Sequence, residues 1–384
     1  MKTAQNLNNA KAALLGFHGF RSTGDDALAS AIGWWLFENC GLNKYVIPAE
    51  PHDLPVLPKP LKVSTPLPWL KRGRFRRDWR WHFAVKSSEI VLLAGGANLH
   101  ERIDYEHFMK LVKLARKTDS LAFGALGVSM GPFETQQKID QCGKFLNAID
   151  FLTVRDHLSY EMACQYSLPY KPVEAMDAVL TLPGVYGIST EPKAELKHDI
   201  LDIGVSVSPY KPLTGYGTGT AGDCVFAIAD AMIRFSREQT IRVNLFEFSG
   251  YASGGDRFLI EELSSALEGK CEVAIWPYNL NPSVIWKKVA DMDIMICTRF
   301  HASVFSYASG TPFVMLDYHP KCTAFAQDIG LPEELRLDVY NLHSQDLIDR
   351  LELLLSTDRP RPALPFVDAH SRAMLNFGPL EKML

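Results

Sequence analysis

Three residues in the last third of the chain could together bind an anion and move a proton. Arg299 and His301 follow the apolar run Ile294–Cys297, and Lys321 follows a second apolar run at 312–316. A guanidinium matches a carboxylate or phosphate with parallel hydrogen bonds, an ammonium is a point charge, and an imidazole exchanges a proton near neutral pH. One such residue alone is more often a surface charge or a helix cap. Three that converge favour a site for a small, multiply charged anion that undergoes acid/base chemistry.

The two apolar runs are expected to be neighbouring buried strands of one βαβ unit. Residues 302–309 between them have helical spacing, and the pattern stops at Gly310. In an open α/β sheet the ligand lies outside the carboxyl ends of the parallel strands. That edge is where the trio of Arg299, His301 and Lys321 falls.

The same alternation of strands and helices recurs in two series along the chain. Expected strands are 12–17, 90–93, 121–126 and 151–154, then 203–207, 242–248, 272–276, 294–297 and 313–316. Expected helices are 27–38, 105–117 and 159–166, then 222–236, 257–267 and 282–290. We therefore expect two Rossmann-like, doubly wound α/β domains that face each other across a cleft, residues 1–185 and 199–345. A helical tail at 346–384 is expected to pack back across the domains.

Composition excludes several classes of protein. With 384 residues, 47% of them hydrophobic, and a formal charge of −4, the chain can build two cores and has no general affinity for nucleic acid. Seven cysteines without a C-x-x-C pair argue against a disulfide framework and a structural zinc site. The first twenty residues have too short an apolar run for a signal peptide, and no segment has the length of a membrane span. We expect a cytoplasmic protein.

One basic, aromatic segment at 69–82 departs from this scheme. It follows residues 48–68, where recurrent proline is expected to exclude regular structure, and it interleaves six cations with three tryptophans and one phenylalanine. This pattern is typical of an element that binds at the membrane interface, which would place the protein peripherally at the inner face of the membrane. A solvated loop and helix with tryptophans folded into the core is an equal alternative.

Four loops at expected strand ends could contact a ligand. Gly24 and Asp25 open a helix whose amides attract anions, although Asp25 and Asp26 could instead cap it. Gly95 and Gly96 allow close approach of a ligand to the backbone.

The third and fourth loops follow the next two expected strands. Residues 124–132, which include Gly131, match neither a dinucleotide fingerprint nor a Walker A loop, so NAD and ATP chemistry are disfavoured. Arg155 ends the fourth strand beside Asp156, a pair that is more often structural but lies on the same sheet edge.

Taken in order, these motifs resemble the polysaccharide pyruvyl transferase family. The resemblance covers residues 15–331 and rests on seven motifs. They are Gly24-Asp25, Ala94-Gly95-Gly96, the 127–132 turn, Val154-Arg155-Asp156 with Ser159, Asp177, Arg299-x-His301 and Tyr318-x-x-Lys321. It implies a GT-B-like fold and an enzyme that moves a pyruvyl group, as a ketal, from phosphoenolpyruvate to a sugar of a cell-surface polysaccharide or its lipid-linked precursor, with release of phosphate.

The resemblance also assigns roles to residues of this chain. Arg155, His301 and Lys321 are carried over as catalytic or donor-binding, and Arg299 joins them as substrate-binding. The other substrate-binding positions are Gly24, Asp25, Gly95, Gly96, Gly131 and Tyr318. No cofactor or metal is implied, because phosphoenolpyruvate is a substrate and the cations can neutralise its carboxylate and phosphate.

The chemistry of ketal formation adds two requirements. A proton must reach the methylene carbon and another must leave the sugar hydroxyl, and His301 is the candidate for this work. A carboxylate near the central carbon would stabilise positive charge there, and Asp25, Asp26 and Glu101 are equal candidates. Departures from the family pattern, such as Ser22-Thr23 where Asn usually precedes Gly-Asp, lie mostly in the acceptor-side first domain.

Two other functions fit the same residues. A nucleotide-sugar glycosyltransferase of the GT-B class would use Arg299 and Lys321 on a diphosphate and His301 as a base. A catalytically silent relative would bind an anionic glycan without turnover.

Overall fold

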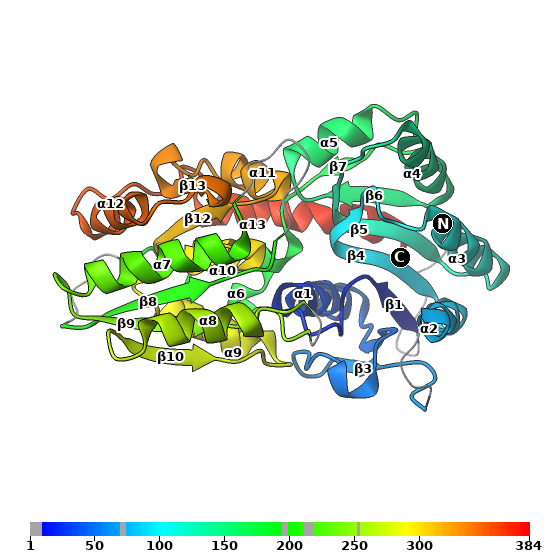
Figure 1. The fold of residues 1–384 in the computed structure, drawn as a ribbon. Coiled ribbons are helices and arrows are strands. Elements are labelled where there is room, and N and C mark those ends of the chain that lie inside the picture. The colour runs from blue at the N-terminus through cyan, green and yellow to red at the C-terminus, as the bar shows by residue number, and fades with distance from the viewer. Residues whose placement is uncertain (1–9, 70–73, 194–198, 211–218, 252–253) are drawn as a thin grey trace. The chain divides into compact units, whose positions relative to one another are not determined.

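The computed structural model describes residues 10–69, 74–193, 199–210, 219–251 and 254–384, and it divides the chain into two compact units. Unit 1 comprises Met1–Arg21, Asp25–Leu182 and Val367–Leu384, and unit 2 comprises Ser22–Gly24 and Pro183–Phe366. Each unit is built on one parallel sheet (Figure 1). The expected fold class, two α/β domains that each contain a parallel sheet, is therefore confirmed.

In unit 1 the described strands form a seven-stranded sheet of order β3-β2-β1-β4-β5-β6-β7. The strands are β1 (Lys11–Leu15), β2 (Lys44–Val46), β3 (Lys62–Ser64), β4 (Ile90–Leu99), β5 (Ala122–Met130), β6 (Phe151–Val154) and β7 (Val173–Glu174). The helices are α1 (Thr23–Cys40), α2 (Arg74–Lys86), α3 (Tyr105–Lys117), α4 (Gln136–Ala148), α5 (His157–Cys164), α13 (Phe366–Met374) and α14 (Gly378–Met383), with short 3-10 turns at Pro51–Asp53, Ala178–Thr181 and Leu375–Phe377.

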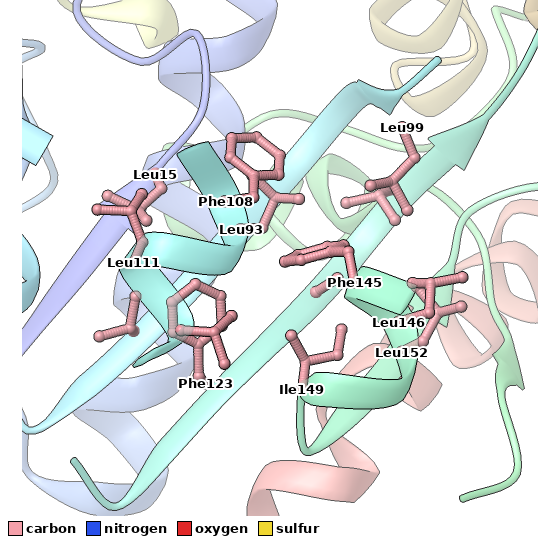
Figure 2. Packing of buried hydrophobic residues seen from close by; sticks show 14 of the residues in the cluster. Leu15, Leu93, Leu99, Phe108, Leu111, Phe123, Phe145, Leu146, Ile149 and Leu152 are labelled. Atoms are coloured by element: carbon pink, nitrogen blue, oxygen red, sulfur yellow. The ribbon is translucent and has the colours of Figure 1, made fainter. Parts of the chain in front are cut away.

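The core of unit 1 explains why its central strands read as unbroken apolar runs. All nine residues of β5 are buried, as expected for a parallel strand covered on both faces. On one face, Phe108 of α3 and Phe145 of α4 pack with ring centroids 5.3 Å apart, and Phe145 also contacts Phe123 of β5 (Figure 2). Burial of these large rings is the main source of stability for this layer.

In unit 2 the described strands form a six-stranded sheet of order β10-β9-β8-β11-β12-β13. The strands are β8 (Leu201–Ser206), β9 (Ile241–Phe246), β10 (Glu272–Trp276), β11 (Ile294–Cys297), β12 (Phe313–Asp317) and β13 (Arg336–Asp338). The helices are α6 (Pro183–Tyr186), α7 (Ala221–Phe235), α8 (Arg257–Leu267), α9 (Pro282–Asp291), α10 (Phe300–Ala308), α11 (Pro320–Asp328) and α12 (Ser344–Leu355), with 3-10 turns at Glu333–Leu335 and Val339–Asn341.

The sequence pattern missed several short strands, besides the helices α4 and α11. β2, β3, β7 and β13 have two or three residues each, and none of them was expected. The expectation that residues 48–68 lack regular structure is wrong at Pro51–Asp53 and at β3, which pairs only with β2. An edge strand needs no apolar run because only one side of it is hydrogen-bonded and little of it is buried.

The chain returns to unit 1 at Val367, where a buried asparagine fastens its last segment. Asn376 donates through Nδ2 to the Met176 carbonyl at 2.7 Å and accepts through Oδ1 from the Thr153 hydroxyl at 2.8 Å. Next to it, the ring of Phe377 stacks on Trp35 of α1 with centroids 4.7 Å apart. The tail is therefore part of the core of unit 1.

Replacing this asparagine should loosen the tail. Asn376→Ala removes several buried hydrogen bonds and leaves the Met176 carbonyl unsatisfied, so we expect the free energy of unfolding to fall by about 2–4 kcal/mol. Urea unfolding followed by tryptophan fluorescence measures it. The matched control is Asn147→Ala on the exposed face of α4, which should change stability little. Equal effects of both variants would show that the Asn376 network does not hold the tail.

Candidate functional site

Arg299, His301 and Lys321 lie at the carboxyl ends of two paired parallel strands of unit 2. β11 pairs with β12, Arg299 is the N-cap residue of α10, and His301 is in its first turn. Lys321 is in the first turn of α11, directly after β12. The structure therefore brings the trio to the single edge that the sequence indicates, at the starts of two helices whose dipoles also favour an anion.

A buried carboxylate orients the guanidinium of Arg299. Both Nε and Nη2 of Arg299 donate to Oδ1 of Asp256, the Nε bond being 2.9 Å long. The other oxygen of Asp256 accepts from the Ser249 amide at 2.9 Å. Burial raises the pKa of Asp256, while Arg299 and the Ser249 amide act against that shift. The pair fixes the guanidinium, whose side chain is 25% exposed, in one direction.

The ammonium of Lys321 is held by aromatic rings instead of a carboxylate. Its Nζ lies 5.5 Å from the ring centroid of Tyr318 and 5.8 Å from that of Phe300. Tyr318 is held in turn, because the Tyr340 hydroxyl donates to its carbonyl at 3.0 Å. Within the part of the chain that the structure describes, Lys321 has no carboxylate partner. Its charge is therefore not cancelled by an acidic side chain.

His301 lies against the backbone of Gly24, which belongs to unit 2. The segment Ser22–Gly24 is attached by an antiparallel bridge from Ser22 to Ser249 and by a 2.9 Å hydrogen bond from the Thr23 amide to the Phe248 carbonyl. A Cβ added at Gly24 would lie 1.9 Å from Nδ1 of His301. Only glycine allows the imidazole to occupy this position.

Arg155 is placed in unit 1, in a buried network. Its Nε donates to the Ser129 hydroxyl at 2.7 Å and its Nη1 pairs with Asp177 Oδ2 at 2.9 Å. The Ser129 hydroxyl donates to Asp156, which caps α5 through the Ser159 amide. The Arg155 side chain is 2% exposed, so it joins the ends of β5 and β6 to Asp177.

The paired glycines of β4 have two different surroundings. A Cβ at Gly95 would meet the side chain of Leu28 at 2.6 Å, so this glycine lets α1 pack closely on the sheet. A Cβ at Gly96 would instead lie 3.0 Å from Oδ1 of Asp25 and 3.6 Å from Nδ2 of Asn98. Gly96 thus leaves room between two polar side chains.

Asp26 and Glu101 are bonded to backbone amides of unit 1. Asp26 is buried and accepts from the Gly19 amide at 2.9 Å. Glu101 accepts from the Glu134 and Thr135 amides, and these hydrogen bonds, the Glu134 one above all, lower the pKa of Glu101. It thereby anchors the loop that follows Gly131, whose φ of +77° requires glycine. Of the three carboxylates proposed from the sequence, Asp25 is the one that lies over Gly96.

Two site residues gave no clear signal in the sequence. Asp256 is 43 positions from Arg299 and follows a glycine pair, so nothing local marks it as the partner of Arg299. His18 is fully buried, and its Nδ1 lies 2.6 Å from the Asp25 carbonyl. Burial lowers the pKa of His18, so the neutral imidazole donates to that carbonyl at neutral pH. The sequence pattern did not indicate His18 as a site residue, because it simply follows the apolar run 12–17.

Three further properties of the described residues concern thiol reactivity, metal binding and membrane-spanning helices. Cys297, two residues before Arg299, is buried, and burial raises its pKa to about 12, so it is not a thiolate nucleophile at neutral pH. No group of three or more His, Cys, Asp or Glu side chains within the described ranges could hold a metal ion. None of the helices in those ranges combines the length and apolar composition that crossing a bilayer requires.

Comparison with known proteins gives one family match. Residues 23–320 match the model of the family described as polysaccharide pyruvyl transferase. No curated protein matches the chain significantly by sequence.

Several solved structures are similar to this chain in fold. A Listeria monocytogenes protein assigned as UDP-N-acetylglucosamine 2-epimerase superposes with a TM-score of 0.60 at 10% identity, covering 95% of this chain and 93% of its own. The Neisseria meningitidis UDP-GlcNAc 2-epimerase, solved with UDP-GlcNAc, gives 0.59 at 10% identity, with 97% and 99% covered. Anabaena HepE in complex with UDP-glucose gives 0.54 at 12% identity, with 98% and 99% covered. At these identities the likeness shows a GT-B-like fold alone.

The contact between Gly24 and His301 can be tested by adding one methyl group. Gly24→Ala should force the imidazole or the 22–24 segment to move, which we expect to cost about 1–3 kcal/mol of stability. Thermal unfolding measures it. Gly184→Ala is the control, because a Cβ at that helical glycine of unit 2 has no heavy atom within 4 Å. If both variants unfold alike, the position of His301 does not depend on glycine at 24.

Proposed function

We propose that this chain, which belongs to the polysaccharide pyruvyl transferase family and is a transferase, moves the pyruvyl group of phosphoenolpyruvate onto a sugar hydroxyl pair. The acceptor would be a cell-surface polysaccharide or its lipid-linked precursor. The observation that carries this proposal is the trio of Arg299, His301 and Lys321 at two neighbouring helix starts of unit 2. A donor with a carboxylate and a phosphate on three carbons needs such convergent positive charge.

The trio divides the work of binding the donor. The fork of Arg299, aimed by Asp256, suits a planar carboxylate or two phosphate oxygens. Lys321 lies over the rings of Tyr318 and Phe300, where an anion would meet a charge that no described carboxylate neutralises. The N-terminal end of α10, which begins directly after Arg299, adds the positive end of a helix dipole.

The proposed reaction balances as an addition followed by substitution at C2 of the donor. A proton adds to the methylene carbon, which becomes methyl, and a first sugar hydroxyl adds to C2 and releases its proton. The C–O bond to phosphate then breaks, the second hydroxyl adds to C2, and its proton goes to the departing phosphate. The products are the ketal and inorganic phosphate. His301 is our candidate for carrying these protons, because an imidazole exchanges a proton near neutral pH and His301 lies in the first turn of α10, directly after Arg299.

Positive charge on C2 between these steps calls for a carboxylate. The carboxylates that the sequence offers for this role, Asp25, Asp26 and Glu101, stay equal candidates in our proposal. Arg155 is proposed to act through its network in unit 1, where it holds the ends of β5 and β6 through Ser129 and Asp177.

Donor binding tests this function directly. In calorimetry with phosphoenolpyruvate, Lys321→Ala should weaken binding by about tenfold to a hundredfold, the range expected for one charge-assisted hydrogen bond. Arg299→Lys should weaken it similarly, because it keeps the charge but loses the fork. The matched control is Lys288→Ala, which removes another unit 2 lysine that lies over an aromatic ring, 4.7 Å from the Trp276 centroid, and should leave binding unchanged.

The same titration separates the alternatives. Binding of UDP-GlcNAc but not of phosphoenolpyruvate to the wild type would replace this proposal by a nucleotide-sugar glycosyltransferase. Donor binding that is equal in Lys321→Ala and Lys288→Ala would remove Lys321 from the donor site. Binding of a glycan without turnover of any donor would favour the third hypothesis, a catalytically silent relative that binds an anionic glycan.

The basic segment 69–82 offers a second contact for this enzyme. Arg80 turns inward, with its side chain 4% exposed and its Nη1 2.7 Å from Glu50, and Trp81 stacks on Phe108. Trp69 and Trp79 are exposed. Leu70 to Gly73 lie outside the described residues, so that part of the segment rests on the sequence. We propose that the segment touches the inner face of the membrane, where a lipid-linked acceptor would be found.

Flotation with vesicles that contain anionic lipid tests this contact. Replacing four arginines of the segment by serine should reduce the floated fraction several-fold, because each basic residue near such a surface contributes about 1 kcal/mol. The four are Arg72, Arg74, Arg76 and Arg77.

The control variant loses the same number of positive charges, so that a difference in flotation reflects where the charges lie and not how many are lost. It replaces four exposed lysines of α3 and α4 by serine, namely Lys110, Lys113, Lys117 and Lys144. This variant should float like the wild type. Equal flotation of the two quadruple variants would end the proposal of membrane contact.

A further inference from the structure

We propose that Phe17 and Phe20 form a stacking platform in unit 1 for the pyranose ring of the acceptor, beside Asp25. This inference rests on the proposed transfer to a sugar and names where and how the sugar is bound. The platform belongs to the loop of residues 16–21 that follows β1, here called the Phe loop.

The Phe loop presents one ring to solvent and buries its neighbour. Phe17 is 52% exposed, while His18 is 1% exposed. The ring of Phe20 meets that of Phe17 edge-on, with centroids 6.1 Å apart and planes at 66°. Two aromatic rings thus stand together at the carboxyl end of a central strand, the edge of an α/β sheet where ligands bind.

This exposure is imposed by a fixed backbone. Asp26 accepts from the Gly19 amide at 2.9 Å, and Nδ1 of His18 lies 2.6 Å from the Asp25 carbonyl. A Cβ at Gly19 would lie 2.4 Å from the Cβ of Ala49, so the loop packs closely there. With these three points fixed, Phe17 cannot turn into the core without breaking buried hydrogen bonds.

Polar groups that could bind sugar hydroxyls follow on the same edge. The carboxylate of Asp25 and the amide of Asn98 flank Gly96, at 3.0 Å and 3.6 Å from the position of an added Cβ. Asn98 is kept in place by a hydrogen bond from its Nδ2 to the Gly95 carbonyl. Sugar sites combine an aromatic face for the C–H groups of the ring with a few placed polar groups for its hydroxyls. The Phe loop and Gly96 supply both.

Size argues for a sugar and against a protein partner. A stable protein interface buries about 800 Å² on each side, whereas the Phe loop exposes the ring of Phe17, has the half-buried ring of Phe20 against it, and buries His18 and the glycines beside them. One hexose ring is of the size that two phenyl rings can cover. The carboxylate of Asp25 nearby would also be costly to bury under an apolar protein surface.

Saturation-transfer NMR tests the platform without requiring turnover. The probes are methyl β-D-galactopyranoside, methyl β-D-glucopyranoside and methyl N-acetyl-β-D-mannosaminide, each added to the full chain with and without phosphoenolpyruvate. In the wild type we expect transfer to the C–H protons of one ring face of at least one probe. Phe17→Ala should weaken that binding about tenfold. Phe258→Ala, which removes an equally exposed phenylalanine from α8, should leave it unchanged.

Two additions make the result decisive. Phe17→Trp keeps a stacking face and should retain the transfer, and calorimetry with phosphoenolpyruvate should give the same donor affinity for Phe17→Ala as for the wild type. Transfer that is equal in Phe17→Ala and the wild type, or absent from the wild type with all three probes, would overturn the platform. If the wild type itself does not bind phosphoenolpyruvate, that result would instead count against the proposed function.

Discussion

The bond between the buried carboxylate of Asp256 and Arg299 is the interaction on which the candidate site of unit 2 depends. It joins the loop after β9 to the start of α10, two segments 43 residues apart in sequence. The same loop carries Ser249, whose amide completes the hydrogen bonds of Asp256 and whose backbone bridges to Ser22. Through Ser22–Gly24 this arrangement reaches the imidazole of His301. One buried carboxylate therefore fixes the guanidinium and, through its loop, the segment that packs on the histidine.

The two arginines and the lysine proposed for catalysis or substrate binding differ in how their charges are compensated. Arg155 is almost fully buried and forms an ion pair with Asp177, so its charge is neutralised by an interaction that holds strand ends together. Arg299 is paired but remains partly exposed, which leaves its orientation fixed and its edge near solvent. Lys321 has ring faces as neighbours. Because an anionic ligand gains most from a cation that no carboxylate has already neutralised, Lys321 should contribute most per charge.

How much the sequence could predict depended on where the signal for each feature lies. The βαβ segment from β11 to β12 was predictable, because both strands are apolar runs and Gly310, at φ +65°, ends the helix between them. Strands of two or three residues were not, since their existence depends on a neighbour far away in sequence. The trio could be found because its members follow strands. Asp256 and His18 could not, because their importance comes from contacts and burial that only the fold creates.

Exposure of Phe17 shows the same distinction between local pattern and tertiary context. As the last residue of an apolar run, Phe17 looks like the end of a buried strand, and the strand in fact ends at Leu15. The chain then turns so that His18, not Phe17, occupies the interior, although a phenyl ring gains more from burial than an imidazole does. The fold accepts this arrangement because His18 and Asp26 together bond the Asp25 carbonyl and the Gly19 amide. These polar bonds keep the ring of Phe17 in water, and that exposed ring is the feature on which the proposed sugar platform depends.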